Sequence, residues 1–141
     1  MTNTKTMLAL LALGAGVAFA GPAFAEKMKA TLDGKSEVPP TTSAGKGAAD
    51  IDYDAATKKL TWKLTYSGLT GPATAAHFHG PAEAGKNAGV AVAIPNATSS
   101  PAEGSATLTD AQAADLMAGK YYVNVHTAAN PNGEIRGQVT K

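Results

Sequence analysis

Short segments in which apolar and polar residues alternate recur along most of this chain, and they constrain its fold more than any other feature. One example is residues 58–66, where Leu60, Trp62 and Leu64 alternate with polar neighbours. This period of two is typical of strands that bury one face, and the turn-forming residues between the segments favour antiparallel pairing. The pattern predicts strands at residues 27–33, 47–54, 58–66, 74–80, 88–95, 103–108, 121–127 and 134–140.

About eight short strands that each bury one face cannot form one flat sheet with water on both sides. We therefore predict an all-β fold, a Greek-key antiparallel β-sandwich with one short helix. Its inward residues include Ile51, Tyr53, Tyr66, Val90, Val92 and Ile94 in addition to those named above. The helix is predicted in "LTDAQAADLMAGK", where Thr109 and Gln112 form a capping box and Gly119 ends the helix. The turn-rich stretches "GKSEVPPTTSAGKG" and "PNATSSPAEG" are predicted to be surface connections.

The first 25 residues are predicted to be a signal peptide. Lys5 is followed by an apolar stretch over residues 7–19, and Ala23, Phe24 and Ala25 suit a signal peptidase. The apolar stretch is shorter than the roughly 20 residues that a membrane helix needs, and no later segment is apolar enough to span. The sequence thus predicts export to the periplasm or the extracellular space, cleavage after Ala25, and one domain over residues 26–141.

Charge and cysteine content exclude several classes of function. The chain has 12 basic and 11 acidic residues, and without Lys5 the two are equal in number. Because no lysine or arginine cluster occurs, we expect no nucleic-acid partner. The chain has no cysteine, which excludes thiolate metal sites, redox cysteine pairs and cysteine nucleophiles.

The chain has three histidines, and the strand pattern places all of them on polar faces. In an extended segment His77 and His79 share a face, with Cα atoms roughly 7 Å apart, while Phe78 points to the core. The third, His126, ends "YYVNVH", where it shares the polar face with Tyr122 and Asn124. Imidazoles bind both copper and zinc, so we predict one shared site for either of these metals. The competing interpretation is that these are ordinary surface histidines.

The segment "HTAANPNGEIRGQV" is predicted to form a hairpin around the turn at residues 130–133. This turn would place Arg136 roughly opposite His126, and a register slip of one residue would move it to the other face. The simplest interpretation of Glu134 and Arg136 is a solvated face that carries an ordinary ion pair.

Three stretches together, "AHFHGPAEAG", "AGVAVAI" and "LTDAQAADLMAGKYYVNVHTAANPNGEIRGQV", resemble the CHRD domain family, named for the repeated domain of chordin. The architecture that this resemblance implies is similar to the Greek-key β-sandwich of copper/zinc superoxide dismutases. By that similarity His77 and His79 match the paired metal ligands, His126 matches the late ligand and Arg136 matches the anion-guiding arginine. The chain departs from those enzymes in having no bridging histidine, no separate zinc-binding loop and no disulfide cysteines.

Two functions therefore follow from the sequence. One is an exported copper-binding protein with superoxide dismutase-like oxidoreductase chemistry on a small anion such as superoxide. The other is a non-enzymatic module for protein interaction or structure, by analogy with chordin. The sequence leaves the protein partner unidentified and is compatible with a homodimer.

Overall fold

The structure is a computed structural model, and it describes residues 14, 16 and 25–141. The predicted signal peptide lies outside the described residues except for those at positions 14, 16 and 25, so it stays a prediction. Within the described part of the chain, no helix has both the length and the apolar character needed to cross a membrane.

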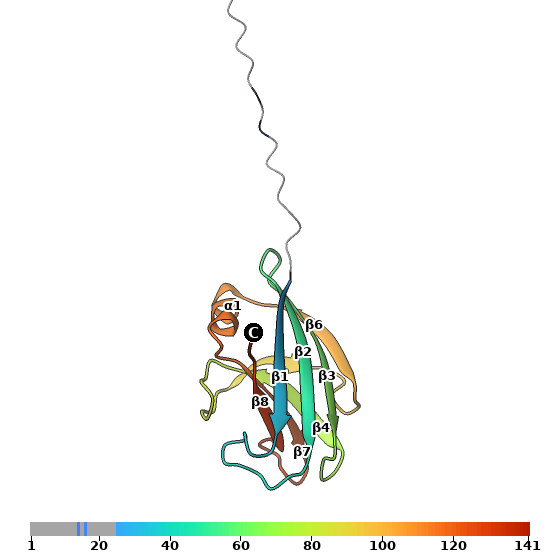
Figure 1. Ribbon diagram of the computed structural model, residues 1–141. Coiled ribbons are helices and arrows are strands. Elements are labelled where there is room, and N and C mark those ends of the chain that lie inside the picture. The colour runs from blue at the N-terminus through green and yellow to red at the C-terminus, as the bar shows by residue number, and fades with distance from the viewer. Residues whose placement is uncertain (1–13, 15, 17–24) are drawn as a thin grey trace, which may run out of the picture.

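Eight strands and one helix make up the described domain, which confirms the predicted all-β class (Figure 1). Each predicted strand is present, with ends that differ by a few residues. The elements are β1 (Glu26–Asp33), β2 (Lys46–Asp54), β3 (Lys59–Ser67), β4 (Ala73–His79), β5 (Val90–Ile94), β6 (Ala102–Thr107), α1 (Asp110–Met117), β7 (Tyr122–Thr127) and β8 (Ile135–Gln138).

All eight strands belong to one continuous antiparallel sheet, in the order β5-β4-β7-β8-β1-β2-β3-β6. The sheet curls until it is nearly a barrel (Figure 1), rather than splitting into two separate sheets. Its two halves are joined where β1 meets β8, at the single ladder pair Asp33–Arg136 and the isolated bridge Lys29–Thr140. Because this joint is short, the halves face each other across the core as the layers of a sandwich do.

The core forms between the two halves of the sheet. The predicted inward residues of β2 and β3 are buried, except for Tyr66, which is partly buried. Trp62 meets Phe78 of the opposite half edge-to-face, with ring centroids 5.1 Å apart. One prediction is wrong, because Val90 is 56% exposed. A bulge shifts the β4–β5 register so that His79 pairs with Val90 instead of Ala91, and this turns Val90 outward.

The helix has the predicted termini. The Thr109 side chain accepts a hydrogen bond from the Gln112 N–H, and the Gln112 side chain accepts one from the Thr109 N–H. Gly119 follows the C-cap with φ of 75°, a left-handed conformation that glycine adopts without strain. Gln112 also donates to the Ala91 carbonyl, which ties the helix to β5.

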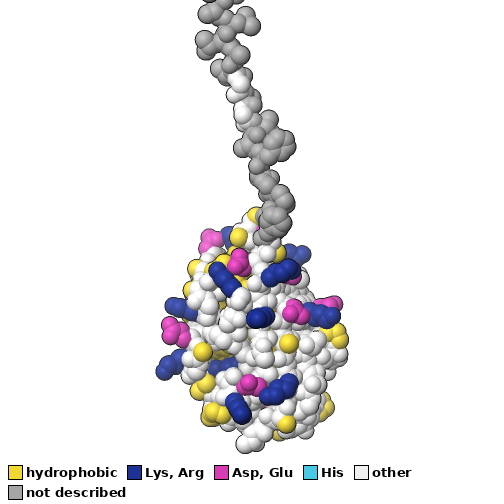
Figure 2. Space-filling model, viewed as in Figure 1, with side chains coloured by type: hydrophobic (Ala, Val, Ile, Leu, Met, Phe, Trp, Pro, Cys, Tyr) yellow, Lys and Arg dark blue, Asp and Glu magenta, His cyan; other side chains and the backbone are white. Residues whose placement is uncertain are grey.

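Basic and acidic side chains are interspersed on the face seen in Figure 2. In the ladder of β1, β2, β3 and β6, Lys29 is paired with Asp50, Asp50 with Lys63 and Lys63 with Glu103. Alternation of positive and negative charges keeps a solvated sheet face soluble without creating a patch of a single charge sign.

Candidate metal centre

The three histidines converge, as the sequence predicts. His77 and His79 lie on β4 and His126 lies on the neighbouring strand β7, where His126 pairs with Ala75 and Asn124 pairs with His77. One nitrogen atom from each ring lies within 4.8 Å of the other two. The cluster forms because the alternation of β4 and β7 points all three rings to the same side of the sheet.

Backbone carbonyl groups fix the orientation of two of these rings. Nδ1 of His126 lies 2.9 Å from the carbonyl oxygen of Pro131, and Nδ1 of His79 lies 3.0 Å from that of Ala88. A carbonyl oxygen can only accept a hydrogen bond, so Nδ1 of each ring carries a proton. In the neutral form of each ring, Nε2 then has a free lone pair. Nδ1 of His77 lies 3.0 Å from Nε2 of His126 and donates to it in this arrangement.

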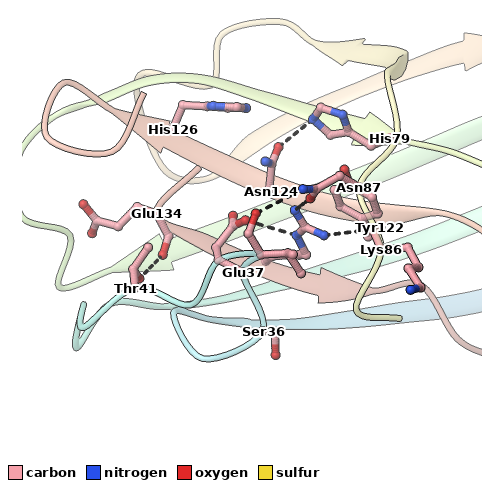
Figure 3. Close-up of polar contacts among 12 residues, drawn as sticks. Ser36, Glu37, Thr41, His79, Lys86, Asn87, Tyr122, Asn124, His126 and Glu134 are labelled. Carbon is pink, nitrogen blue, oxygen red and sulfur yellow. Dashed lines mark hydrogen bonds and ion pairs between the residues drawn. The ribbon is translucent and has the colours of Figure 1, made fainter. Parts of the chain in front are cut away.

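His79 is the most enclosed of the three, with 8% of its surface exposed, whereas His77 and His126 are partly exposed. Its ring stacks on Tyr122, with centroids 4.9 Å apart, and Nε2 lies 2.9 Å from Oδ1 of Asn124 (Figure 3). Burial lowers the pKa of His79. The pKa of His77 is also lowered, mainly by burial and in addition by the nearby rings of His126 and His79. Both rings are therefore neutral, the form that binds metal, at neutral pH.

The donor set fits copper or zinc. Two nitrogen ligands at the usual bond length of about 2.0–2.1 Å in tetrahedral geometry lie about 3.4 Å apart. The His77–His126 pair, at 3.0 Å, is already close to this spacing. Hydrogen bonds from the distal ring nitrogen to a backbone carbonyl are typical of metal-binding histidines.

Arg136 lies on the predicted face but in a different register. It pairs with Asn124 rather than with His126, because the β7–β8 ladder is shifted by two residues from the expected one. The side chain is 5% exposed, and its guanidinium lies 3.9 Å from the centroid of the Tyr122 ring. It donates to Glu37, to the Lys86 carbonyl and to Oδ1 of Asn87, so it holds two loops against the sheet.

Glu37 is the residue of this site that the sequence analysis missed. It is 3% exposed, although its loop was expected to be a surface connection. Burial raises its pKa, against the opposing effect of Arg136, whose Nε donates to Oε2 at 3.1 Å. Strand periodicity gives no signal for a loop residue, and the one available signal is that Glu37 is the only acidic residue between Asp33 and Asp50.

Glu134 also differs from expectation. The solvated ion-pair interpretation is wrong, because Glu134 is fully buried and Arg136 pairs with Glu37 instead. The Glu134 carboxylate accepts hydrogen bonds from the side chains of Ser43, Thr70, Thr127 and Asn130 and from the Thr70 N–H. Thr41 donates to its backbone carbonyl (Figure 3). Glu134 thus joins the loop before β2, the loop before β4 and the β7–β8 turn.

The fold and the site define a small all-β domain with three convergent histidines braced by buried polar loops. The family model for the CHRD domain matches residues 28–139, and the chain belongs to that family. A comparison with curated proteins found no match. A comparison with solved structures found none either.

Proposed function

We propose that this protein binds one metal ion, with copper as the preferred metal, through His77, His79 and His126. The proposal rests on the hydrogen bonds that the Nδ1–H groups of His79 and His126 donate to backbone carbonyl oxygens. Because backbone carbonyls accept from both, Nε2 is the atom with which His79 and His126 can bind a metal, and Nε2 of His126 lies 3.0 Å from Nδ1 of His77. Surface histidines without a ligand have no need of this arrangement.

Imidazole donors suit copper and zinc, and the chain provides no thiolate to favour a softer site. When bound, copper supplies one-electron redox chemistry, and three protein ligands leave room for a small anion such as superoxide. Superoxide dismutase-like activity is therefore the chemistry proposed for the copper form. The export predicted from residues 1–25 agrees with this proposal, since an exported protein would meet its metal outside the cytoplasm.

The contacts of Arg136 support a positioning role for it rather than anion guidance. Glu37, Asn87 and the Lys86 carbonyl occupy its guanidinium, which is shielded from solvent. The guanidinium of Arg136 packs against the ring of Tyr122, and His79 stacks on that same ring. Arg136 therefore supports the position of His79 indirectly.

An anaerobic titration with Cu(I) and then Cu(II), followed spectroscopically, tests the proposal. We expect one equivalent to bind, and His77→Ala to weaken binding by at least tenfold, while Lys63→Ala on the outer face serves as the control. Superoxide dismutation by the copper form is then measured against free copper. Tight binding without dismutation would leave a metal-binding protein that is not an enzyme, and no binding would favour the non-enzymatic interaction module.

A further inference from the structure

The side chain of Asn124 lies between His79 and Glu37, and each of these presents an acceptor to it (Figure 3). Nδ1 of His79 donates to the Ala88 carbonyl, so Nε2 of the neutral ring holds a lone pair. That lone pair faces Oδ1 of Asn124 at 2.9 Å. Two acceptors in this position repel each other, and a buried site has no bulk water to relieve them.

The second acceptor is Oε1 of Glu37, which is buried and has no hydrogen-bond partner among the described residues. Gly133 shows how close this atom is to Asn124. A Cβ added to Gly133 would overlap Oε1 of Glu37 and would lie 2.7 Å from Nδ2 of Asn124. The amide nitrogen and the unpartnered carboxylate oxygen therefore adjoin the same small space, which a glycine leaves open.

Reversing the amide would not resolve the conflict. Nδ2 of Asn124 could then donate to His79, but Oδ1 would turn toward the side of Glu37. Since an amide has one donor end and one acceptor end, Asn124 cannot serve both neighbours while the ring of His79 is neutral and free of metal.

We propose that Asn124 is a positioning residue that exchanges neighbours when the site takes up its metal: its Oδ1 moves away from Nε2 of His79, and its Nδ2–H donates to Oε1 of Glu37. The inference rests on the proposed metal site. A metal on Nε2 uses the lone pair that now faces Oδ1, and the released amide finds an acceptor already held in place by Arg136. Glu37, which forms the buried ion pair with Arg136, would therefore gain a hydrogen bond from Asn124 only when the metal is bound.

Nuclear magnetic resonance with Zn²⁺ as a diamagnetic probe tests the exchange. One equivalent should shift the imidazole ¹⁵N signals of the three histidines. It should also move one Asn124 side-chain amide proton downfield and slow its exchange with water. In Glu37→Gln the histidine shifts should persist while the Asn124 response is lost. Histidine shifts with an unchanged Asn124 amide would refute the exchange alone. Absence of histidine shifts would refute the metal site as well.

Asn124→Ala provides a second test that does not disturb the buried ion pair. Zn²⁺ uptake, followed by stopped flow with a zinc-sensitive dye, should be about tenfold faster, because Oδ1 of Asn124 no longer has to move away from Nε2 of His79 before the metal can reach that atom. Circular dichroism checks that the variant is folded. Uptake at the wild-type rate or slower would contradict the exchange.

Discussion

At the scale of single residues, Glu134 shows how a buried charge is held without a cation. Burial alone would raise its pKa, but the hydrogen bonds from Thr70, Ser43 and Thr127 outweigh this effect and lower the pKa to about 2. A carboxylate whose native pKa lies below its ordinary value of 4.5 stabilises the fold above pH 4.5 and loses that contribution as the pH falls toward 2. The difference corresponds to about 3 kcal/mol at neutral pH.

Glu134→Gln should lower the free energy of unfolding at pH 7 by about 3 kcal/mol, since the amide nitrogen would face groups that donate to the carboxylate. Between pH 4.5 and pH 2 the difference from wild type should shrink. Urea denaturation across this range measures both effects, with the exposed Glu103→Gln as the control. A variant as stable as wild type at pH 7 would show that the three loops do not depend on this carboxylate.

Arg136→Ala should destabilise the protein by about 3–5 kcal/mol, because it leaves Glu37 buried without its cation. The exposed pair of Lys27 and Asp52 offers the matched control, and Lys27→Ala should have little effect. Thermal unfolding compares the two. If Arg136→Ala kept full stability and metal affinity but lost reaction rate, the anion-guiding role implied by the family resemblance would be restored.

At the scale of elements, the helix depends on its first turn. Thr109→Ala removes one half of the capping box and should cost about 1 kcal/mol. The exposed Thr107 on β6 allows a matched threonine-to-alanine control, and thermal unfolding measures both variants. A Thr109→Ala protein that unfolds at the wild-type temperature would mean that the Gln112 link to β5 holds the helix by itself.

The strands and the helix could be predicted from sequence because their signals are local. Alternation placed Trp62, Leu64 and Phe78 in the core, and the cap residues marked the helix ends. The orientation of Val90 and the partner of Arg136 could not be predicted, since a bulge and a two-residue shift in register depend on how neighbouring strands settle.

At the scale of the whole molecule, the candidate site combines a predictable part with an unpredictable one. The three histidines lie on strands, so the period of two was enough to group them. Their supports come from loops, including Glu37, Ala88 and Pro131, and no periodicity relates a loop residue to a strand far away in sequence. The polar strand face is consequently covered rather than solvated, with Tyr122 and Asn124 both buried.

Metal affinity should depend on pH because protons compete for the same nitrogens. The pKa values of His77 and His79 lie below their ordinary 6.5, mainly because of burial, so affinity should change little between pH 8 and about pH 6.5. It should fall as the pH drops further and those rings take up protons. Competition titrations with a chelator of known pH dependence measure this. Affinity that stays constant down to about pH 5, below the ordinary imidazole range, would indicate carboxylate ligands instead.

The proposed function depends on the binding of one metal ion by three histidines on two neighbouring strands. Elemental analysis of the protein purified without added metal or chelator, compared with a variant in which His77, His79 and His126 are all alanine, tests it most directly. We predict close to one copper per chain in the wild-type protein and none in the variant, with both proteins folded by circular dichroism. A folded wild-type protein with no more copper or zinc than the variant, and no uptake when either metal is supplied, would contradict metal binding by these histidines.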